Sequence, residues 1–154
     1  MLNEKAIDEN IGILTLTESH LHDDFLEGEI EMRGFTNYRA DRANGVRKGG
    51  IITYVRHDLL PGLQVKEAGS IGNIEFLIIF IKELEMLLVT LYRPPSASST
   101  DFKSAIAAIQ REIESAEGPT PRVALTGDFN FPSIKWEKHN IDAQQTQTFK
   151  PRTL

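Results

Sequence analysis

The chain has 154 residues, of which 40% are hydrophobic and 25% charged, a composition typical of a single globular domain. Its net charge of -5, from 22 acidic and 17 basic residues, excludes a general basic surface for nucleic acid, so such contact would need a local basic patch or a metal ion. The absence of cysteine excludes disulfides and thiolate chemistry, and it agrees with an intracellular protein.

The first candidate acid follows the first predicted strand. Residues 2–9 show a weak amphipathic helical pattern, and residues 11–17 form a nearly continuous apolar run of strand length. Glu18 comes directly after that run, so we expect it at a strand end. The alternative is an ordinary solvated acid that opens a short helix.

Residues 22–48 are polar, and we expect them to be irregular. Four basic residues lie near the end of this stretch, which makes it the best candidate for a phosphate-contacting loop. They are Arg39, Arg42, Arg47 and Lys48. A solvated loop without such a role is the alternative.

Further strands are predicted at 51–56, 63–66, 74–82 and 86–92, with a hairpin loop at 83–85. Tyr92 ends the last of them, and Arg93 and two prolines follow it. A tyrosine hydroxyl and a guanidinium can both donate to phosphate oxygens, which makes these two residues candidates for phosphate contact. Tyrosines also commonly finish core strands without any chemical role.

A helix is predicted over 101–116, with Ser99 or Thr100 as its N-cap and Gly118-Pro119 after its end. Its apolar residues are spaced four, three and four apart, so one face should pack on a sheet. They are Phe102, Ile106, Ile109 and Ile113. With the strand that begins at Arg122, the order of elements predicts an α/β or α+β sandwich.

That last strand ends in Gly127-Asp128-Phe129-Asn130. In extended chain, the spacing of Asp128 and Asn130 directs both side chains to the same side. A carboxylate can hold a divalent ion or accept a proton from water, while a carboxamide offers an uncharged donor and acceptor. The same residue types also favour a simple turn.

Four blocks of this sequence, taken together, resemble the endonuclease/exonuclease/phosphatase superfamily. They are Leu-Thr-Glu-Ser-His-Leu at 16–21, Gly-Gly-Ile-Ile-Thr-Tyr-Val at 49–55, Leu-Tyr-Arg-Pro-Pro at 91–95 and Gly-Asp-Phe-Asn-Phe-Pro-Ser-Ile-Lys-Trp at 127–136. Within the superfamily they look most like the apurinic-endonuclease-like domain that precedes the reverse transcriptase in non-LTR retrotransposon polyproteins.

The resemblance implies a DNase I-like two-sheet sandwich that nicks DNA by metal-dependent phosphodiester hydrolysis. Glu18 matches the glutamate that binds Mg²⁺ or Mn²⁺, and Asp128 matches the aspartate that activates or orients water. Asn130 matches the asparagine that positions the phosphate or that aspartate, and Tyr92 matches the tyrosine that stabilises transition-state charge. Arg39, Arg42 and Arg93 are the predicted nucleic-acid contacts. The implied partners are DNA and a reverse transcriptase domain in a longer polyprotein, and the nucleus is then one compatible compartment.

The chain also departs from the family pattern. It lacks the first-strand asparagine and the C-terminal aspartate and histidine of the family, and His139 does not fit the place of that histidine. We therefore expect a single domain over 1–154 that is truncated at both ends, with its recognisable core at 11–137 and a polar tail at 138–154. We also expect impaired activity, because each missing group commonly contributes about 10²-fold.

The sequence is also compatible with two alternatives to a DNA nickase. One is a catalytically dead remnant that still binds nucleic acid, and the other is a phosphatase that acts on a small phosphoester.

Overall fold

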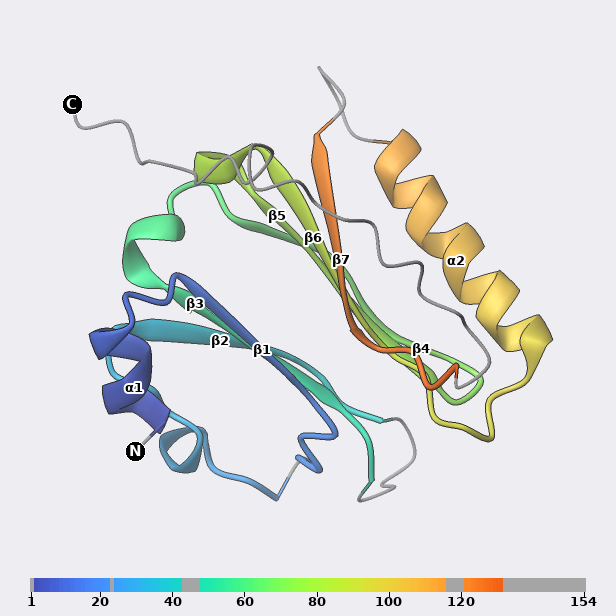
Figure 1. Cartoon of the computed structure of the whole chain (residues 1–154), viewed down its shortest axis with the longest axis horizontal. Helices are drawn as coiled ribbons and strands as arrows, with labels where there is room; N and C mark the ends of the chain where they lie inside the picture. The colour runs from blue at the N-terminus through green and yellow to red at the C-terminus, as the bar shows by residue number, and fades with distance from the viewer. Residues whose placement is uncertain (1, 23, 43–47, 116–120, 132–154) are drawn as a thin grey trace, which may run out of the picture.

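The structure is a computed structural model that describes residues 2–22, 24–42, 48–115 and 121–131, and its strands form two facing sheets (Figure 1). The first sheet is antiparallel and has the order β1 (Ile13–Thr17), β3 (Ile51–Arg56), β2 (Phe35–Ala40). The second has the order β4 (Gln64–Ile71), β5 (Ile74–Ile81), β6 (Met86–Tyr92), β7 (Arg122–Asp128). In the second sheet β6 and β7 run parallel, whereas the other neighbouring strands run antiparallel. The predicted two-sheet α/β sandwich is confirmed.

Helices cover the outer faces of the two sheets. The helix α1 (Leu2–Asp8) lies beside the first sheet, and α2 (Ser99–Glu114) covers the outer face of the second (Figure 1). Short 3-10 turns lie at Glu27–Glu29, His57–Leu59 and Lys82–Leu84. Within the described residues, no helix combines the length and the apolar character that a membrane span requires.

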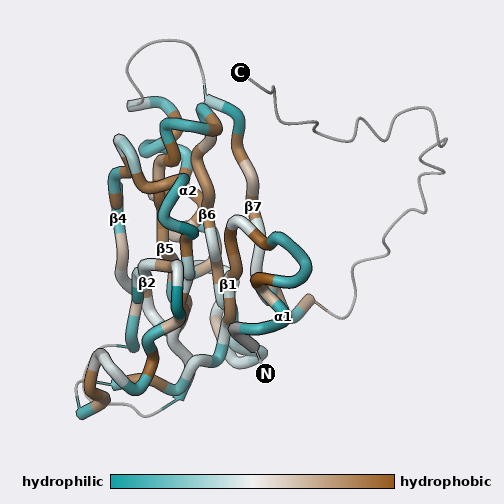
Figure 2. The backbone as a smooth tube through the Cα atoms, turned by 90° about the vertical axis from the view of Figure 1, so that its left-hand side faces the viewer, coloured by the Kyte–Doolittle hydropathy of each residue, from teal (hydrophilic) through white to brown (hydrophobic). Residues whose placement is uncertain are grey.

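Side chains of β5 alternate between two cores, as strand geometry requires. Phe76 and Ile78 pack toward α2, while Leu77 and Ile79 pack between the sheets. Both faces of β5 and β6 are therefore apolar, and these strands are the most hydrophobic part of the backbone trace (Figure 2). This burial of apolar area is the main force that holds the sandwich together.

Three threonine hydroxyls also join the sheets through the middle of the sandwich. Thr15 bonds to Thr53 within the first sheet and to Thr90 of the second, where the two oxygens lie 3.2 Å apart. Thr53 and Thr90 are fully buried, so these hydrogen bonds satisfy polar groups that would otherwise be costly inside an apolar core.

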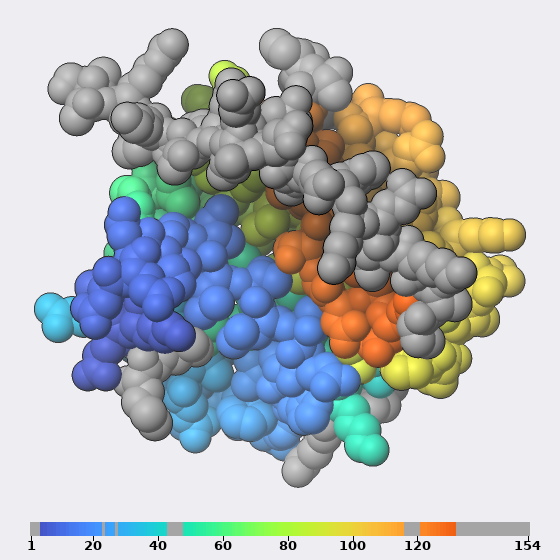
Figure 3. Space-filling model, viewed as in Figure 1, coloured from blue at the N-terminus to red at the C-terminus, as the bar shows by residue number. Residues whose placement is uncertain are grey.

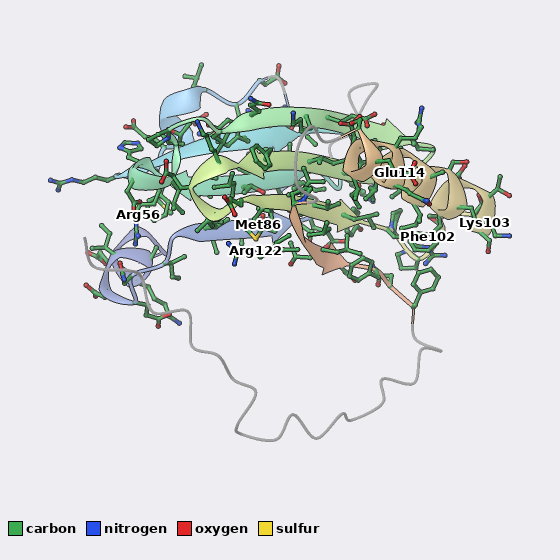
Figure 4. The ribbon with its side chains drawn as sticks, turned by 90° about the horizontal axis from the view of Figure 1, so that it is seen from above. Arg56, Met86, Phe102, Lys103, Glu114 and Arg122 are labelled. Carbon is green, nitrogen blue, oxygen red and sulfur yellow. The ribbon has the colours of Figure 1, made fainter. Side chains whose placement is uncertain are left out.

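The predicted helix and its apolar face are confirmed, with corrected ends. The N-cap is Ser98, whose Oγ accepts a hydrogen bond from the Asp101 backbone N–H at 3.0 Å, rather than Ser99 or Thr100. The apolar stripe of α2 packs on the sheet, with Phe102 on that side and Lys103 projecting away from it (Figure 4). The helix ends at Glu114 instead of residue 116, and Gly118-Pro119 falls outside the described residues.

Two strands differ from the prediction. Residues 35–40 are the strand β2 instead of part of an irregular stretch. The prediction failed because β2 carries polar residues along an edge strand, where the apolar signal is weak. The strand β4 runs over 64–71 instead of 63–66, because its pairing with β5 continues past a register shift between Val65 and Glu67 that interrupts the alternation.

Candidate functional site

The candidate site lies at one rim of the sandwich, where several strands begin or end. In the parallel pair of β6 and β7, Tyr92 lies directly opposite Asp128, so both strands end at the same edge. The strand β1 ends at Thr17 and delivers Glu18 to this rim. In the space-filling view, β1 (blue) and β7 (orange) lie side by side, and the two strands are in contact (Figure 3). The rim is the lower end of both sheets in Figure 1.

The phenol of Tyr92 joins the two sheets at this rim. Tyr92 is 5% exposed, and its hydroxyl donates a hydrogen bond to Glu18 Oε1. Burial, followed by the hydrogen bond to Glu18 and the charge of its carboxylate, raises the pKa of Tyr92 to about 12. The hydroxyl is therefore neutral at physiological pH and remains a hydrogen-bond donor.

Glu18 has an uncommon backbone conformation. Its φ is +54°, and that of His20 is +55°, in the left-handed region that costs L-residues about 1–2 kcal/mol. The backbone between them is held by two hydrogen bonds, from Ser19 N to Gly50 O at 3.2 Å and from His20 N to Gly49 O at 2.8 Å. Strained residues of this kind concentrate at functional sites, where the surrounding structure holds them in place.

Asp128 and Asn130 form a compact turn rather than extended chain. The φ of Asn130 is +45°, and its backbone N–H donates to Asp128 Oδ1 at 3.1 Å. The predicted common direction of the two side chains assumed an extended backbone, and this positive φ shows that the backbone is not extended. The Asn130 amide donates to Arg93 O at 2.9 Å, whereas Asp128 is exposed at the rim.

Gly127 lets β7 approach β6 closely before that turn. Its φ is +133°, and a Cβ at this position would lie 1.8 Å from the backbone oxygen of Leu91. No L-residue with a side chain fits there without displacing one of the two strands. The glycine that marked the strand end in the sequence therefore sets the distance between Tyr92 and Asp128.

All three arginines predicted to contact nucleic acid have partners within the chain, and two of them form ion pairs. Arg39 lies in β2 rather than in a loop, and its guanidinium forms an ion pair with Asp41. Arg42 follows the same strand and forms an ion pair with Glu75. Arg47 falls outside the described residues, and Lys48 is exposed.

Arg93 braces the turn that carries Asn130. It is 8% exposed, and its guanidinium donates to Asn130 O at 3.0 Å and to Ala97 O at 2.8 Å. The guanidinium carbon also lies 4.2 Å from the centre of the Phe131 ring. Contact of this side chain with a phosphate stays a prediction, and what the structure describes is a role in fixing the backbone of the rim.

Glu75 is a rim residue that the sequence analysis missed. It lies opposite Tyr92 in the antiparallel pair of β5 and β6, is 0% exposed, and accepts a hydrogen bond from Arg42 Nε. Burial raises the pKa of this carboxyl, and the neighbouring Arg42 partly offsets the rise. The available signal was a lone glutamate within the apolar run 74–82, where a charge requires a partner.

The chemistry of the oxygen donors at Glu18 and the adjacent Ser19 suits a hydrated divalent cation. Glu18 is exposed at the rim, and the adjacent Ser19 Oγ is buried and has no hydrogen-bond partner among the residues that the structure describes. Carboxylate and hydroxyl oxygens are hard donors, and Mg²⁺ usually binds one or two carboxylates while retaining several waters. In the described ranges, no three His, Cys, Asp or Glu side chains group closely enough to form a dedicated cage. The donor set therefore fits an ion held by one carboxylate and water.

No protein-family model matches the sequence, and no curated protein matches it either. Solved structures do match. An endonuclease/exonuclease/phosphatase family protein from Bacteroides thetaiotaomicron is 18% identical over 84% of this chain and 52% of that chain, with a TM-score of 0.58. The human Nocturnin catalytic domain with bound sulfate anion is 12% identical over 84% of this chain and 55% of that chain, with a TM-score of 0.55.

A third solved structure is D. rerio TDP2 complexed with single-strand DNA product. It is 13% identical over 84% of this chain and 52% of that chain, with a TM-score of 0.51. These likenesses show a shared fold, and the DNase I-like sandwich is confirmed. The chain spans about half the length of the three structures.

Proposed function

We propose that this chain carries part of the active site of a metal-dependent phosphodiesterase that hydrolyses DNA. The observation that carries the proposal is the meeting of Glu18 with Tyr92 across the two sheets, next to Asp128 on the neighbouring strand. An acid in a strained conformation, a neutral phenol and an exposed carboxylate at one rim are the groups that hydrolysis of a phosphodiester needs.

Asp128 and Tyr92 have separate roles in the proposed reaction. Asp128 is exposed at the rim and accepts a proton from the attacking water. The water oxygen forms a bond to phosphorus while the bond from phosphorus to the leaving sugar oxygen breaks, and that oxygen takes a proton from solvent. Tyr92 donates to a non-bridging phosphate oxygen once its hydroxyl turns from Glu18, and its high pKa keeps it a donor.

Glu18 would hold the divalent ion, which when bound supplies charge neutralisation at the leaving oxygen. Asn130 keeps the Asp128 carboxylate in place through its backbone N–H. The side-chain amide nitrogen of Asn130 donates to Arg93 O, and this hydrogen bond fixes the direction of the Asn130 side-chain carbonyl oxygen. Together these contacts fix the proton acceptor before substrate binds, which is the usual source of rate enhancement by orientation.

The sequence motifs and the ligands of the matching structures support DNA as the proposed substrate class. The Nocturnin structure contains a bound sulfate anion and the TDP2 structure contains a single-strand DNA product, and these ligands support a phosphate-containing substrate for this chain. The four sequence blocks at 16–21, 49–55, 91–95 and 127–136 support the retrotransposon type of nickase, with a reverse transcriptase domain as partner in a longer polyprotein.

Nicking of supercoiled plasmid DNA in the presence of Mg²⁺ tests the proposal. We expect the chain to nick plasmid at an impaired rate, and Asp128→Ala to reduce that rate by about a further 10²-fold or more. Equal rates for the two proteins would reject the role of Asp128 and indicate a contaminating nuclease. Salt-sensitive DNA binding without nicking would point to the non-catalytic remnant, and hydrolysis of a small phosphoester without nicking would point to a phosphatase.

A further inference from the structure

We propose that Glu75 and Arg42 are positioning residues that hold the two sides of the rim in register. The inference deepens the proposed function and rests on it, because the groups that the pair positions are the reactive ones. Neither residue needs to touch the substrate, since both act on the hydrogen bond between Tyr92 and Glu18 that joins the two sheets.

In the second sheet, Glu75 lies beside Tyr92. Glu75 and Tyr92 are directly opposed on β5 and β6, so their side chains share the inner face of the sheet. Opposed residues have Cβ atoms about 5 Å apart and pack against each other. Glu75 has no exposed surface, so its side chain is buried on the same face of the sheet as Tyr92.

On the side of the first sheet, the ion pair of Arg42 and Glu75 contacts the backbone at Gly49. A Cβ at Gly49 would lie 2.7 Å from Arg42 Nη2 and 2.9 Å from Glu75 Oε1, so the ion pair packs directly on the Gly49 backbone. The oxygen of Gly49 in turn accepts the hydrogen bond from His20 N at 2.8 Å. His20 is two residues after Glu18, so the pair supports the backbone that holds the carboxylate at the rim.

Stability alone does not account for this pair. Glu75 Oε2 is buried and lacks a hydrogen-bond partner among the described residues, so the carboxylate is incompletely compensated. Replacing a buried ion pair by apolar residues of similar size is often neutral or stabilising. By this rule the pair adds little net stability, and because it contacts both halves of the rim its position fits a role in placing the reactive groups.

The test separates placement from stability. The variant Arg42→Met/Glu75→Leu removes both charges and should unfold at the same urea concentration as the wild-type chain, or higher. The readout of this test is the downfield NMR resonance of the Tyr92 hydroxyl proton, which would be assigned by its disappearance in Tyr92→Phe. We expect the double variant to lose this resonance through exchange with water, and plasmid nicking to fall about 10²-fold through kcat rather than KM.

Two further variants complete the design. Glu75→Gln keeps the size of the side chain and an acceptor for Arg42, so it carries the test if the double variant does not fold, and we expect a weaker resonance and about tenfold slower nicking. The control is Arg56→Met/Asp58→Asn, which removes an ion pair of 2.7 Å at the opposite end of β3 and should leave the resonance unchanged.

The outcomes distinguish this inference from the proposed function. An unchanged Tyr92 resonance in a folded variant lacking the pair, or the absence of that resonance from the wild-type chain, would overturn the positioning role. Loss of the resonance in the variant, with no Mg²⁺-dependent nicking by the wild-type chain, would support positioning and reject the phosphodiesterase.

Discussion

The Tyr92 hydroxyl donates to the carboxylate of Glu18, and this hydrogen bond joins the rims of two sheets through residues 74 positions apart in the sequence. The hydrogen bond links the stability of the fold to the protonation state of Tyr92, because it stabilises the protonated phenol beside a carboxylate. Burial and the carboxylate together raise the pKa of Tyr92 from 10.0 to about 12.

This shift predicts a measurable loss of stability at alkaline pH. The unfolded chain releases the tyrosine proton near pH 10, whereas the folded protein keeps it until about pH 12. The free energy of unfolding therefore falls as pH rises through this window, by on the order of 2 kcal/mol. In Tyr92→Phe this contribution is absent, so urea unfolding measured at pH 9 to 12 should show a shallower decline.

Tyr38→Phe is the matched control, because the pKa of Tyr38 is raised by burial alone. It should change the slope less than Tyr92→Phe does. Parallel curves for the wild-type chain and Tyr92→Phe would show that the phenol is not held in its protonated form by the fold.

Local patterns made much of the fold predictable. The strands β5 and β6 are continuous apolar runs, and the α2 stripe repeats every three or four residues, so each element is specified within a short window. The strand β2 was not predicted, because its stability comes from pairing with β3 and from two buried ends, Phe35 and Ala40. That information lies in the tertiary structure rather than in the pattern.

The candidate site could likewise be predicted from the sequence only in part. Motif and strand-end position identified Glu18, Tyr92 and Asp128, and the structure brings them to one rim. Their catalytic roles stay predictions. The ion pair of Arg42 with Glu75 could not be read from the sequence, because it joins residues 33 positions apart across two sheets.

Gly127→Ala should be among the most damaging small substitutions in the chain. The added Cβ would lie 1.8 Å from Leu91 O, and the backbone φ of +133° is unfavourable for alanine. We expect a loss on the order of 3 kcal/mol in the free energy of unfolding, measured by urea denaturation. Gly69→Ala is the control within a strand, since no heavy atom lies within 4 Å of its added Cβ, and it should change stability far less. Similar losses for both would contradict the close approach of β6 and β7.

Gly49→Ala tests the space that the ion pair occupies. Gly49 and Gly34 have φ values of +81° and +84°, so alanine meets the same backbone cost at both positions. They differ in surroundings, because a Cβ meets Arg42 Nη2 at 2.7 Å at Gly49 and nothing within 4 Å at Gly34. We expect Gly49→Ala to be more destabilising by roughly 1–3 kcal/mol, the usual cost of overpacking. Equal unfolding free energies would mean that the guanidinium moves aside freely.

Asn130 offers a way to separate backbone shape from amide chemistry. Its φ of +45° suits glycine, while its amide donates to Arg93 O at 2.9 Å. Asn130→Gly keeps the backbone conformation and loses the amide, whereas Asn130→Ala loses the amide and adds left-handed strain of about 1 kcal/mol. Urea denaturation should therefore rank stability as wild-type, then glycine, then alanine.

Plasmid nicking should follow a different order from stability. If the amide fixes the turn that carries Asp128, both variants lose activity by about tenfold or more, because misplaced catalytic groups lose the advantage of orientation. Asn10→Gly is the control, since Asn10 has a φ of +53° and bonds to Arg56 at the other end of the first sheet. Nicking at the wild-type rate by Asn130→Gly would show that the position contributes only its backbone conformation, and the amide would then have no part in the site.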